Sequence, residues 1–169
     1  MSNGIGSHQS TKMGTDVWLT PPEIISALGP FDLDPCTQKE RVFETAKFYF
    51  SKEDDGLSKE WEGFVWMNPP YGSECSKWLE KLSKHNNGIA LIFARTETKS
   101  FQKFIWEKAS SLLFIYNRLT FYTEAGTLGK SNSGAPSVLV GYGSKADERL
   151  KKCGIPGKFL QLNNEAHNA

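Results

Sequence analysis

The sequence predicts an α/β protein in which helices cover both faces of a mainly parallel β-sheet. Short apolar runs rich in strand formers alternate along the chain with segments whose apolar residues recur at helical spacing. The most apolar run, Ile89–Ala94, lacks polar alternation, which is typical of a strand buried on both faces of a parallel sheet. Chains in which strands and helices alternate build such sheets through crossover connections.

A single domain accounts for the chain length of 169 residues. Apolar content of 38% and charged content of 23% are ordinary for a globular protein. We expect a flexible polar arm at residues 1–14, one domain at 15–160 and a tail at 161–169. No apolar run approaches ~20 residues, and the N-terminus lacks the apolar core of a signal peptide, so we expect no membrane partner.

Cysteine and histidine usage predicts neither disulfides nor a bound metal. The three cysteines are odd in number and far apart, and the three histidines lack metal-ligand spacing. Reduced thiols favour a cytoplasmic location. The net charge of +1 gives no basic footprint for nucleic acid. Local lysine clusters are more typical of solvated helix faces than of a phosphate track.

The first expected element is a helix that follows Trp18. Thr20 can cap it, Pro21 stands at the first helical position, and Glu23 completes a capping box. Gly29-Pro30 ends the helix.

A short strand is expected next, at Phe31–Cys36, with Asp34 at its C-terminal tip and placed to accept from an ammonium group. After this strand we expect, in order, a helix at 40–48, a strand at 48–50, a polar loop at 52–57 and a strand at 64–67. The following segments predict a helix at 76–84, a strand at 89–94, a helix at 100–109, a strand at 112–116, a mobile loop at 127–136 and a last strand at 137–142. The tail from Gly154 is weakly patterned.

The strand at 64–67 ends in the stretch Asn68-Pro69-Pro70-Tyr71. Two prolines cannot donate backbone hydrogen bonds, so the strand must stop there. Asn68 precedes a proline and is therefore pushed to an extended conformation. The result is a stiff shelf at the C-terminal end of a strand, which is the edge where open α/β sheets bind ligands.

This shelf suits attack by an exocyclic amine, which is a poor nucleophile because its lone pair is delocalised into the ring. The Asn68 side-chain carbonyl and the Pro69 backbone carbonyl could each accept one of its N–H bonds and so free the lone pair. Tyr71 could stack on the ring that carries the amine.

The shelf motif resembles that of amino-methyltransferases that use S-adenosylmethionine and act on adenine or cytosine amines, or on a glutamine amide. Other segments make the resemblance more specific. Residues 18–23 are similar to the Thr-Pro segment of DNA adenine methyltransferases, and residues 34–36 are similar to the cofactor turn after their first strand. Residues 55–57 resemble their acidic adenine-binding loop, and residues 94–98 and 118–121 resemble later segments. Over residues 17–142 the chain thus resembles the small phage-type DNA N(6)-adenine methyltransferase (Dam-like) family.

The resemblance implies a Rossmann-like methyltransferase fold and a set of site residues. It implies that the shelf residues Asn68, Pro69, Pro70 and Tyr71 are catalytic. S-adenosylmethionine would be bound by Trp18, Thr20, Pro21, Asp34, Pro35, Cys36 and Asp55, with Glu53 and Glu40 as candidate acids for its ribose. Double-stranded DNA would be contacted by Arg95, Arg118 and Lys130, since no separate recognition domain is present.

We therefore expect transfer of a methyl group from S-adenosylmethionine to the 6-amino group of adenine in DNA, after the base has left the duplex stack. Two alternatives stay open: a cytosine-amine or RNA methyltransferase with the same shelf, and a DNA-binding relative without activity. Monomer and homodimer are both compatible with the sequence.

Overall fold

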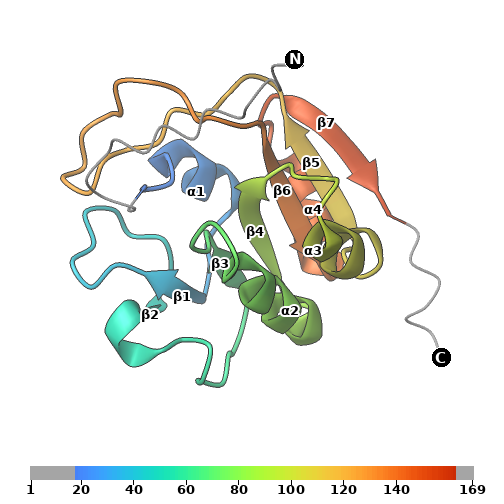
Figure 1. Cartoon of the computed structure of the whole chain (residues 1–169), viewed down its shortest axis with the longest axis horizontal. Coiled ribbons are helices and arrows are strands. Elements are labelled where there is room, and N and C mark those ends of the chain that lie inside the picture. Colours follow the sequence, from blue (N-terminus) through green and yellow to red (C-terminus); the bar gives the residue numbers. More distant parts are fainter. Residues whose placement is uncertain (1–17, 163–169) are drawn as a thin grey trace, which may run out of the picture.

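The centre of the molecule is one seven-stranded β-sheet with the strand order β2-β1-β3-β4-β6-β5-β7 (Figure 1). The computed structural model describes residues 18–162, so the arm expected at 1–14 and most of the expected tail lie outside the described residues. The strands are β1 (Leu33–Thr37), β2 (Phe48–Ser51), β3 (Val65–Met67), β4 (Gly88–Phe93), β5 (Ser111–Ile115), β6 (Ser137–Tyr142) and β7 (Gly157–Gln161).

The predicted α/β architecture with a mainly parallel sheet is confirmed, with an antiparallel part beside the parallel one. Strands β2, β1, β3 and β4 pair in parallel. Strand β6 runs antiparallel to both β4 and β5, and β7 runs antiparallel to β5. Strand β5 therefore points the same way as the parallel four, and only β6 and β7 oppose them.

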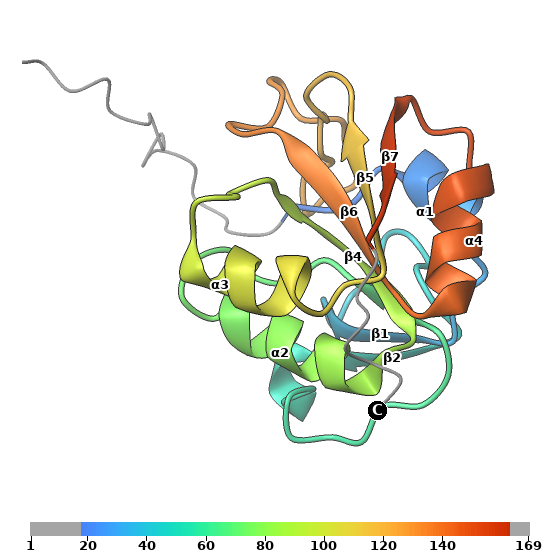
Figure 2. The same cartoon turned by 90° about the vertical axis from the view of Figure 1, so that its right-hand side faces the viewer.

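Helices cover both faces of the sheet, as predicted (Figure 2). On one face lie α1 (Pro22–Leu28) and α4 (Ser144–Lys152); on the other lie α2 (Cys75–His85) and α3 (Lys99–Phe101), which continues into the π-helical turns η2 (Gln102–Trp106). Each face has its own buried apolar cluster, one containing Leu28 and Leu150 and the other containing Leu82 and Ile105. No helix within residues 18–162 is long and apolar enough to cross a membrane.

The central strands divide their side chains between these two clusters. In β3, Val65 and Met67 join the α2 side while Trp66 joins the α1 side, and all three are fully buried. A strand that is buried on both faces needs apolar residues at every position, because successive side chains point to opposite faces. That is why the continuous apolar runs at β3 and β4 predicted strands correctly.

The helix predicted at residues 40–48 is wrong: residues 38–47 form an irregular segment that joins β1 to β2. Its residues are held by tertiary contacts instead of helical ones. The Phe43 ring packs edge-on against Tyr122, with ring centroids 5.1 Å apart. Thr45 donates from its hydroxyl to the Asp34 carboxylate at 2.5 Å. Contacts with residues far away in sequence thus override the local helical spacing.

The expected capping box at α1 is also wrong. Pro21 is the residue before the helix and Pro22 its first residue, and no side chain caps the helix N-terminus. The Thr20 hydroxyl accepts a hydrogen bond from the Asn68 side chain instead, at 3.2 Å.

The C-terminal part contains structure beyond the predicted elements, namely α4 and the edge strand β7. Asp147 of α4 accepts hydrogen bonds from the hydroxyls of Ser110 and Ser111, both at 2.6 Å, and from the Gln161 side chain of β7 at 3.1 Å. This polar junction fastens the helix and the edge strand to β5. Strand β7 is only partly buried, so its sequence lacks the apolar run that identifies a central strand.

Candidate active site

A pocket of about 880 Å³ opens at the C-terminal ends of β1, β2 and β3. The chain passes from β1 to β2 on one side and then crosses to β3 on the other side of β1. This reversal of strand order is the point at which open α/β sheets bind ligands. The pocket wall on the β1–β2 side consists of the irregular segment 38–47 and the loop that follows β2.

The fold brings nearly all of the predicted catalytic and cofactor residues together in this pocket. Of those eleven residues only Pro21 does not line it, while Arg95, Arg118 and Lys130 lie outside its lining. The lining includes Trp18, Thr20, Asp34, Pro35, Cys36, Asp55, Asn68, Pro69, Pro70 and Tyr71.

Asn68 follows directly after β3 and is fixed through its side-chain amide nitrogen. Nδ2 donates to the Trp18 carbonyl oxygen at 3.3 Å and to the Thr20 hydroxyl oxygen at 3.2 Å. The Cys36 thiol donates to the Asn68 backbone carbonyl oxygen at 3.5 Å. Burial raises the pKa of Cys36 well above its ordinary value, with a further contribution from nearby Asp34, so this thiol stays protonated as a donor.

Tyr71 stacks on Phe93, which is the last residue of β4, with ring centroids 4.4 Å apart and planes 7° from parallel. Tyr71 is 38% exposed and lines the pocket. Phe93 covers one face of its ring, and no second ring among residues 18–162 stacks on the opposite face.

Asp34 lies inside β1 rather than at its tip. The regular pairing of β1 with β2 stops at Asp34, and the strand continues irregularly to Thr37. The carboxylate accepts from the Thr45 hydroxyl at 2.5 Å and from the Cys36 N–H at 3.2 Å. Burial raises the pKa of Asp34 from 3.8 to about 6, although both hydrogen bonds act in the opposite direction.

The loop after β2 contributes Asp55 and Gly56 to the pocket. The short 3-10 turn η1 (Lys52–Asp54) leads into Asp55, whose φ of 51° is in the left-handed region. A Cβ on Gly56 would overlap the Pro35 carbonyl oxygen, so only glycine allows the loop to approach β1 this closely. The Lys81 ammonium of α2 donates to the carbonyl oxygens of Leu57, at 2.7 Å, and Lys59.

Beyond the predicted catalytic and cofactor residues, the pocket lining includes Gln38, Thr45 and Glu53. The prediction of a helix at 40–48 misses the contact of Thr45 with Asp34. Gln38 lines the pocket, and its buried Nε2 has no hydrogen-bond partner among residues 18–162. Glu53, one of two candidate acids for ribose, follows β2 closely and pairs with Lys39 at 2.9 Å. In the sequence, the position of Glu53 just after an expected strand is the one signal that it could lie in the pocket.

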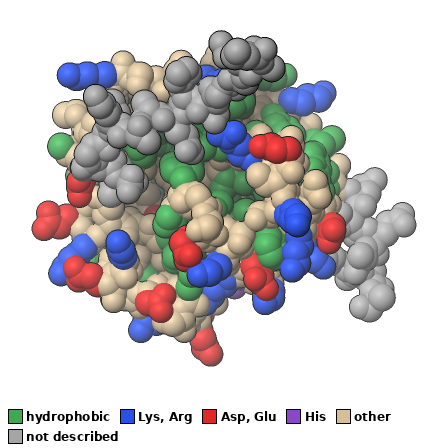
Figure 3. All heavy atoms as spheres, viewed as in Figure 1, with side chains coloured by type: hydrophobic (Ala, Val, Ile, Leu, Met, Phe, Trp, Pro, Cys, Tyr) green, Lys and Arg blue, Asp and Glu red, His purple; other side chains and the backbone are tan. Residues whose placement is uncertain are grey.

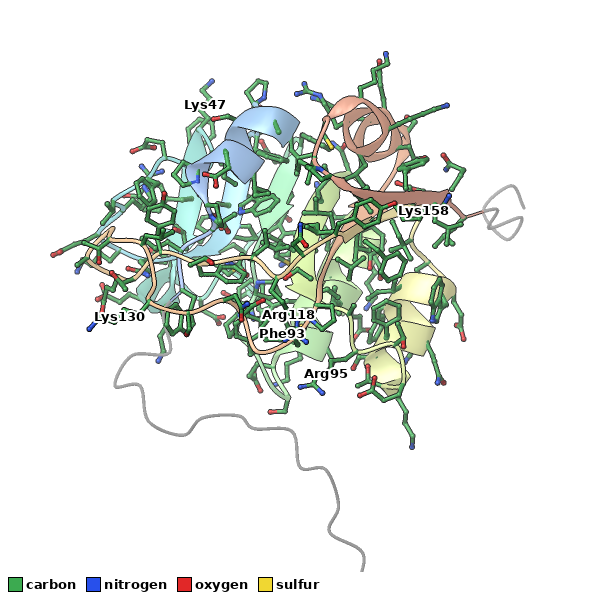
Figure 4. The ribbon with its side chains drawn as sticks, turned by 90° about the horizontal axis from the view of Figure 1, so that it is seen from above. Lys47, Phe93, Arg95, Arg118, Lys130 and Lys158 are labelled. Atoms are coloured by element: carbon green, nitrogen blue, oxygen red, sulfur yellow. The ribbon has the colours of Figure 1, made fainter. Side chains whose placement is uncertain are left out.

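The three residues predicted to contact DNA do not form one cluster. Figure 4 shows Lys130 at one side of the molecule, well apart from Arg95 and Arg118. All three residues are exposed. Arg118 donates to the Ser133 carbonyl oxygen at 3.1 Å, so part of its guanidinium holds the base of the segment 119–133.

Charged side chains of both signs are interspersed over the described part of the face in Figure 3. That distribution agrees with the net charge of +1. Within residues 18–162, no group of three or more His, Cys, Asp or Glu side chains is placed to hold a metal ion.

The family model for DNA N-6-adenine-methyltransferase (Dam) matches residues 7–150 of this chain. No curated protein and no solved structure gives a significant match. The family match covers most of the chain, includes the whole pocket, and favours adenine in DNA over cytosine amines or RNA. The chain therefore belongs to the Dam family: it is an adenine-specific DNA methyltransferase, which transfers a methyl group from S-adenosylmethionine to the 6-amino group of adenine.

Proposed function

We propose that the 880 Å³ pocket is the site of this reaction, and that Asn68, Pro69, Pro70 and Tyr71 act on the adenine. One observation carries the proposal: the Asn68 amide nitrogen donates to Trp18 and Thr20, whereas its Oδ1 has no hydrogen-bond partner among residues 18–162. A carbonyl oxygen at the end of a strand is the acceptor that an exocyclic amine requires.

The residues on the β1–β2 side fit S-adenosylmethionine, which supplies an electrophilic methyl group on a sulfonium. The buried carboxylate of Asp34 suits its ammonium group, and the unpaired Nε2 of Gln38 suits an acceptor such as its carboxylate or ribose oxygens. Glu53 is the candidate for the ribose hydroxyls, since an acid near the end of the second strand serves this purpose in related folds. Trp18, Thr20, Pro21, Pro35, Cys36 and Asp55 complete the proposed cofactor side.

On the substrate side, Asn68 Oδ1 and the Pro69 carbonyl oxygen accept the two N–H bonds of the adenine amine. These acceptors favour a pyramidal nitrogen and direct its lone pair toward the methyl group. Tyr71 stacks on the base with the ring face that Phe93 leaves free. Catalysis then rests on alignment and on two fixed acceptors, and the product proton leaves to water.

The adenine must leave a duplex to reach such a pocket, so we propose double-stranded DNA as the substrate form. Arg95, Arg118 and Lys130, which lie outside the pocket lining, would contact DNA from separate positions, mainly through phosphates.

Replacement of Asn68 by alanine tests the proposed site. We expect Asn68→Ala to lower kcat on the order of 10²–10³-fold, the usual cost of losing a fixed acceptor or donor in a transition state. Affinity for S-adenosylmethionine, measured by calorimetry, should stay within a few-fold of wild type. Asn87→Ala is a matched control, because the Asn87 side chain donates to Gly63 before the start of β4, away from the pocket. Near-normal turnover of Asn68→Ala would remove the proposed mechanism.

A further inference from the structure

The side chain of Asn68 has only one chemically consistent orientation. Among residues 18–162, the hydrogen-bond partners of this side chain are the Trp18 carbonyl oxygen and the Thr20 hydroxyl. A backbone carbonyl can only accept, so the NH₂ end of the amide must face Trp18. Turning the amide over would bring two oxygen acceptors face to face. Both N–H bonds are therefore engaged on the Trp18–Thr20 side, and Oδ1 points away from that segment.

The segment that holds Asn68 is itself fixed on its other side. Leu19 pairs with Tyr122 through two backbone hydrogen bonds of 2.9 and 3.0 Å. Thr20 is buried, and Pro21 and Pro22 follow it at the start of α1. Thr20 therefore presents its hydroxyl to Asn68 from a backbone that cannot shift easily.

We propose that Thr20 is a positioning residue for methyl transfer, which orients the Asn68 carboxamide so that Oδ1 faces the substrate amine. The proposal rests on the proposed function of Asn68 and changes the expected assignment of Thr20, which was to the cofactor. Without the Thr20 hydroxyl, Asn68 keeps only the contact to Trp18 and rotates more freely. If Oδ1 has to be reoriented in each turnover, it stabilises the transition state less, because a preorganised acceptor avoids the cost of reorientation.

Valine at position 20 removes the hydroxyl and keeps the shape of the side chain. We expect Thr20→Val to lower kcat at saturating S-adenosylmethionine about tenfold, which corresponds to the typical contribution of one hydrogen bond. Thr20→Ser keeps the hydroxyl and should restore most of the rate. If the hydroxyl of Thr20 only stabilised the fold, the variants that turn over more slowly would also melt at lower temperature. Thermal melting of all variants tests this.

A double-mutant cycle separates action through Asn68 from any other effect. If Thr20 acts only through Asn68, then adding Thr20→Val to Asn68→Ala should change kcat no further. The inference is overturned by an unchanged kcat of Thr20→Val, by a loss that disappears at saturating cofactor, or by additive losses in the cycle. Normal turnover of Asn68→Ala would instead overturn the proposed site itself, so the two failures are distinguishable.

Discussion

Asp34 carries a charge that folding makes unfavourable. Its carboxylate is buried in β1, and burial raises its pKa to about 6. A buried carboxylate of this kind is stabilised by a positive partner. The proposed partner is the ammonium group of S-adenosylmethionine, whose binding would offset the cost of burying this carboxylate.

The cofactor affinity should therefore fall at acidic pH. Only the ionised carboxylate attracts the ammonium group, and one pH unit below a pKa of 6 it is ionised about one-tenth of the time. We expect calorimetry to give an approximately tenfold weaker binding of S-adenosylmethionine at pH 5 than at pH 7.5. Asp34→Ala and Asp34→Asn should bind about 10-fold to 100-fold more weakly at pH 7.5, with little further change at pH 5. A wild-type affinity that is flat between these pH values would contradict the assignment.

The raised pKa of Asp34 also affects the stability of the cofactor-free protein, to which Asp34 should contribute more at acidic pH, whereas the cofactor affinity should be lower. A group whose pKa is raised by folding favours the folded state most when protonated, and this contribution disappears as the pH rises through 6. The cofactor-free Asp34→Asn variant should therefore melt at a higher temperature than wild type at pH 8. At pH 4 the difference should be much smaller. Thermal melting in the absence of cofactor measures both values.

At the scale of the element, α2 holds the loop after β2, which forms part of the proposed cofactor side of the pocket. Its Lys81 ammonium donates to the carbonyl oxygens of Leu57 and Lys59, next to Asp55 and Gly56. Burial lowers the pKa of Lys81, whereas the nearby Asp55 and Glu60 act in the opposite direction. The ammonium also lies 5.0 Å from the centre of the Trp61 ring.

Lys81→Met should consequently loosen this loop and weaken cofactor binding. We expect a loss of several-fold to tenfold in S-adenosylmethionine affinity, because two hydrogen bonds to a charged group disappear. Lys84→Met is the matched control on the same helix, since within residues 18–162 Lys84 pairs only with the exposed Glu80 side chain. Equal effects of the two variants would mean that the loop does not depend on Lys81.

The segment 119–133 is the second element with a testable contribution. The loop expected at 127–136 overlaps this segment, which folds back on its own beginning. Leu128 bridges to Tyr122, and Ser133 N–H donates to the Leu119 carbonyl oxygen at 2.7 Å. Replacing residues 127–134 with a Gly/Ser linker of equal length should weaken DNA binding and alter site preference. Gel-shift titrations on several duplexes measure both, and unchanged values would identify the segment as a connector.

The limits of sequence reasoning follow from these elements. Strands β3 and β4 were predictable because residues buried on both faces must be apolar, and the shelf was predictable because prolines end strands locally. The bond from Asn68 to Thr20 joins residues 48 positions apart, and the local capping pattern of Thr20 predicted a different partner. The irregular segment 38–47 was missed for the same reason, since its conformation depends on Asp34 and Tyr122.

At the scale of the whole molecule, the weak net charge limits how the protein holds DNA. Each phosphate contact contributes roughly 0.9 to the slope of log affinity against log salt. If Arg95, Arg118 and Lys130 make the main contacts, the slope is about −2.7 and affinity falls ~40-fold between 50 and 200 mM salt. Lys130→Ala should reduce the slope by about 1 on every sequence. A wild-type slope beyond about −6 would require further basic contacts.

The composition of the pocket wall also gives the protein an optical reporter. Of its five tryptophans, Trp18, Trp66 and Trp78 line the pocket, and Trp61 stacks on Trp78 with ring centroids 6.1 Å apart. The fifth, Trp106, belongs to η2 and lies outside the lining. Indole emission responds to quenchers and to polarity nearby, so a molecule that enters the pocket should change the fluorescence of most of the tryptophans at once. Occupancy can therefore be followed in the unlabelled protein, with or without DNA.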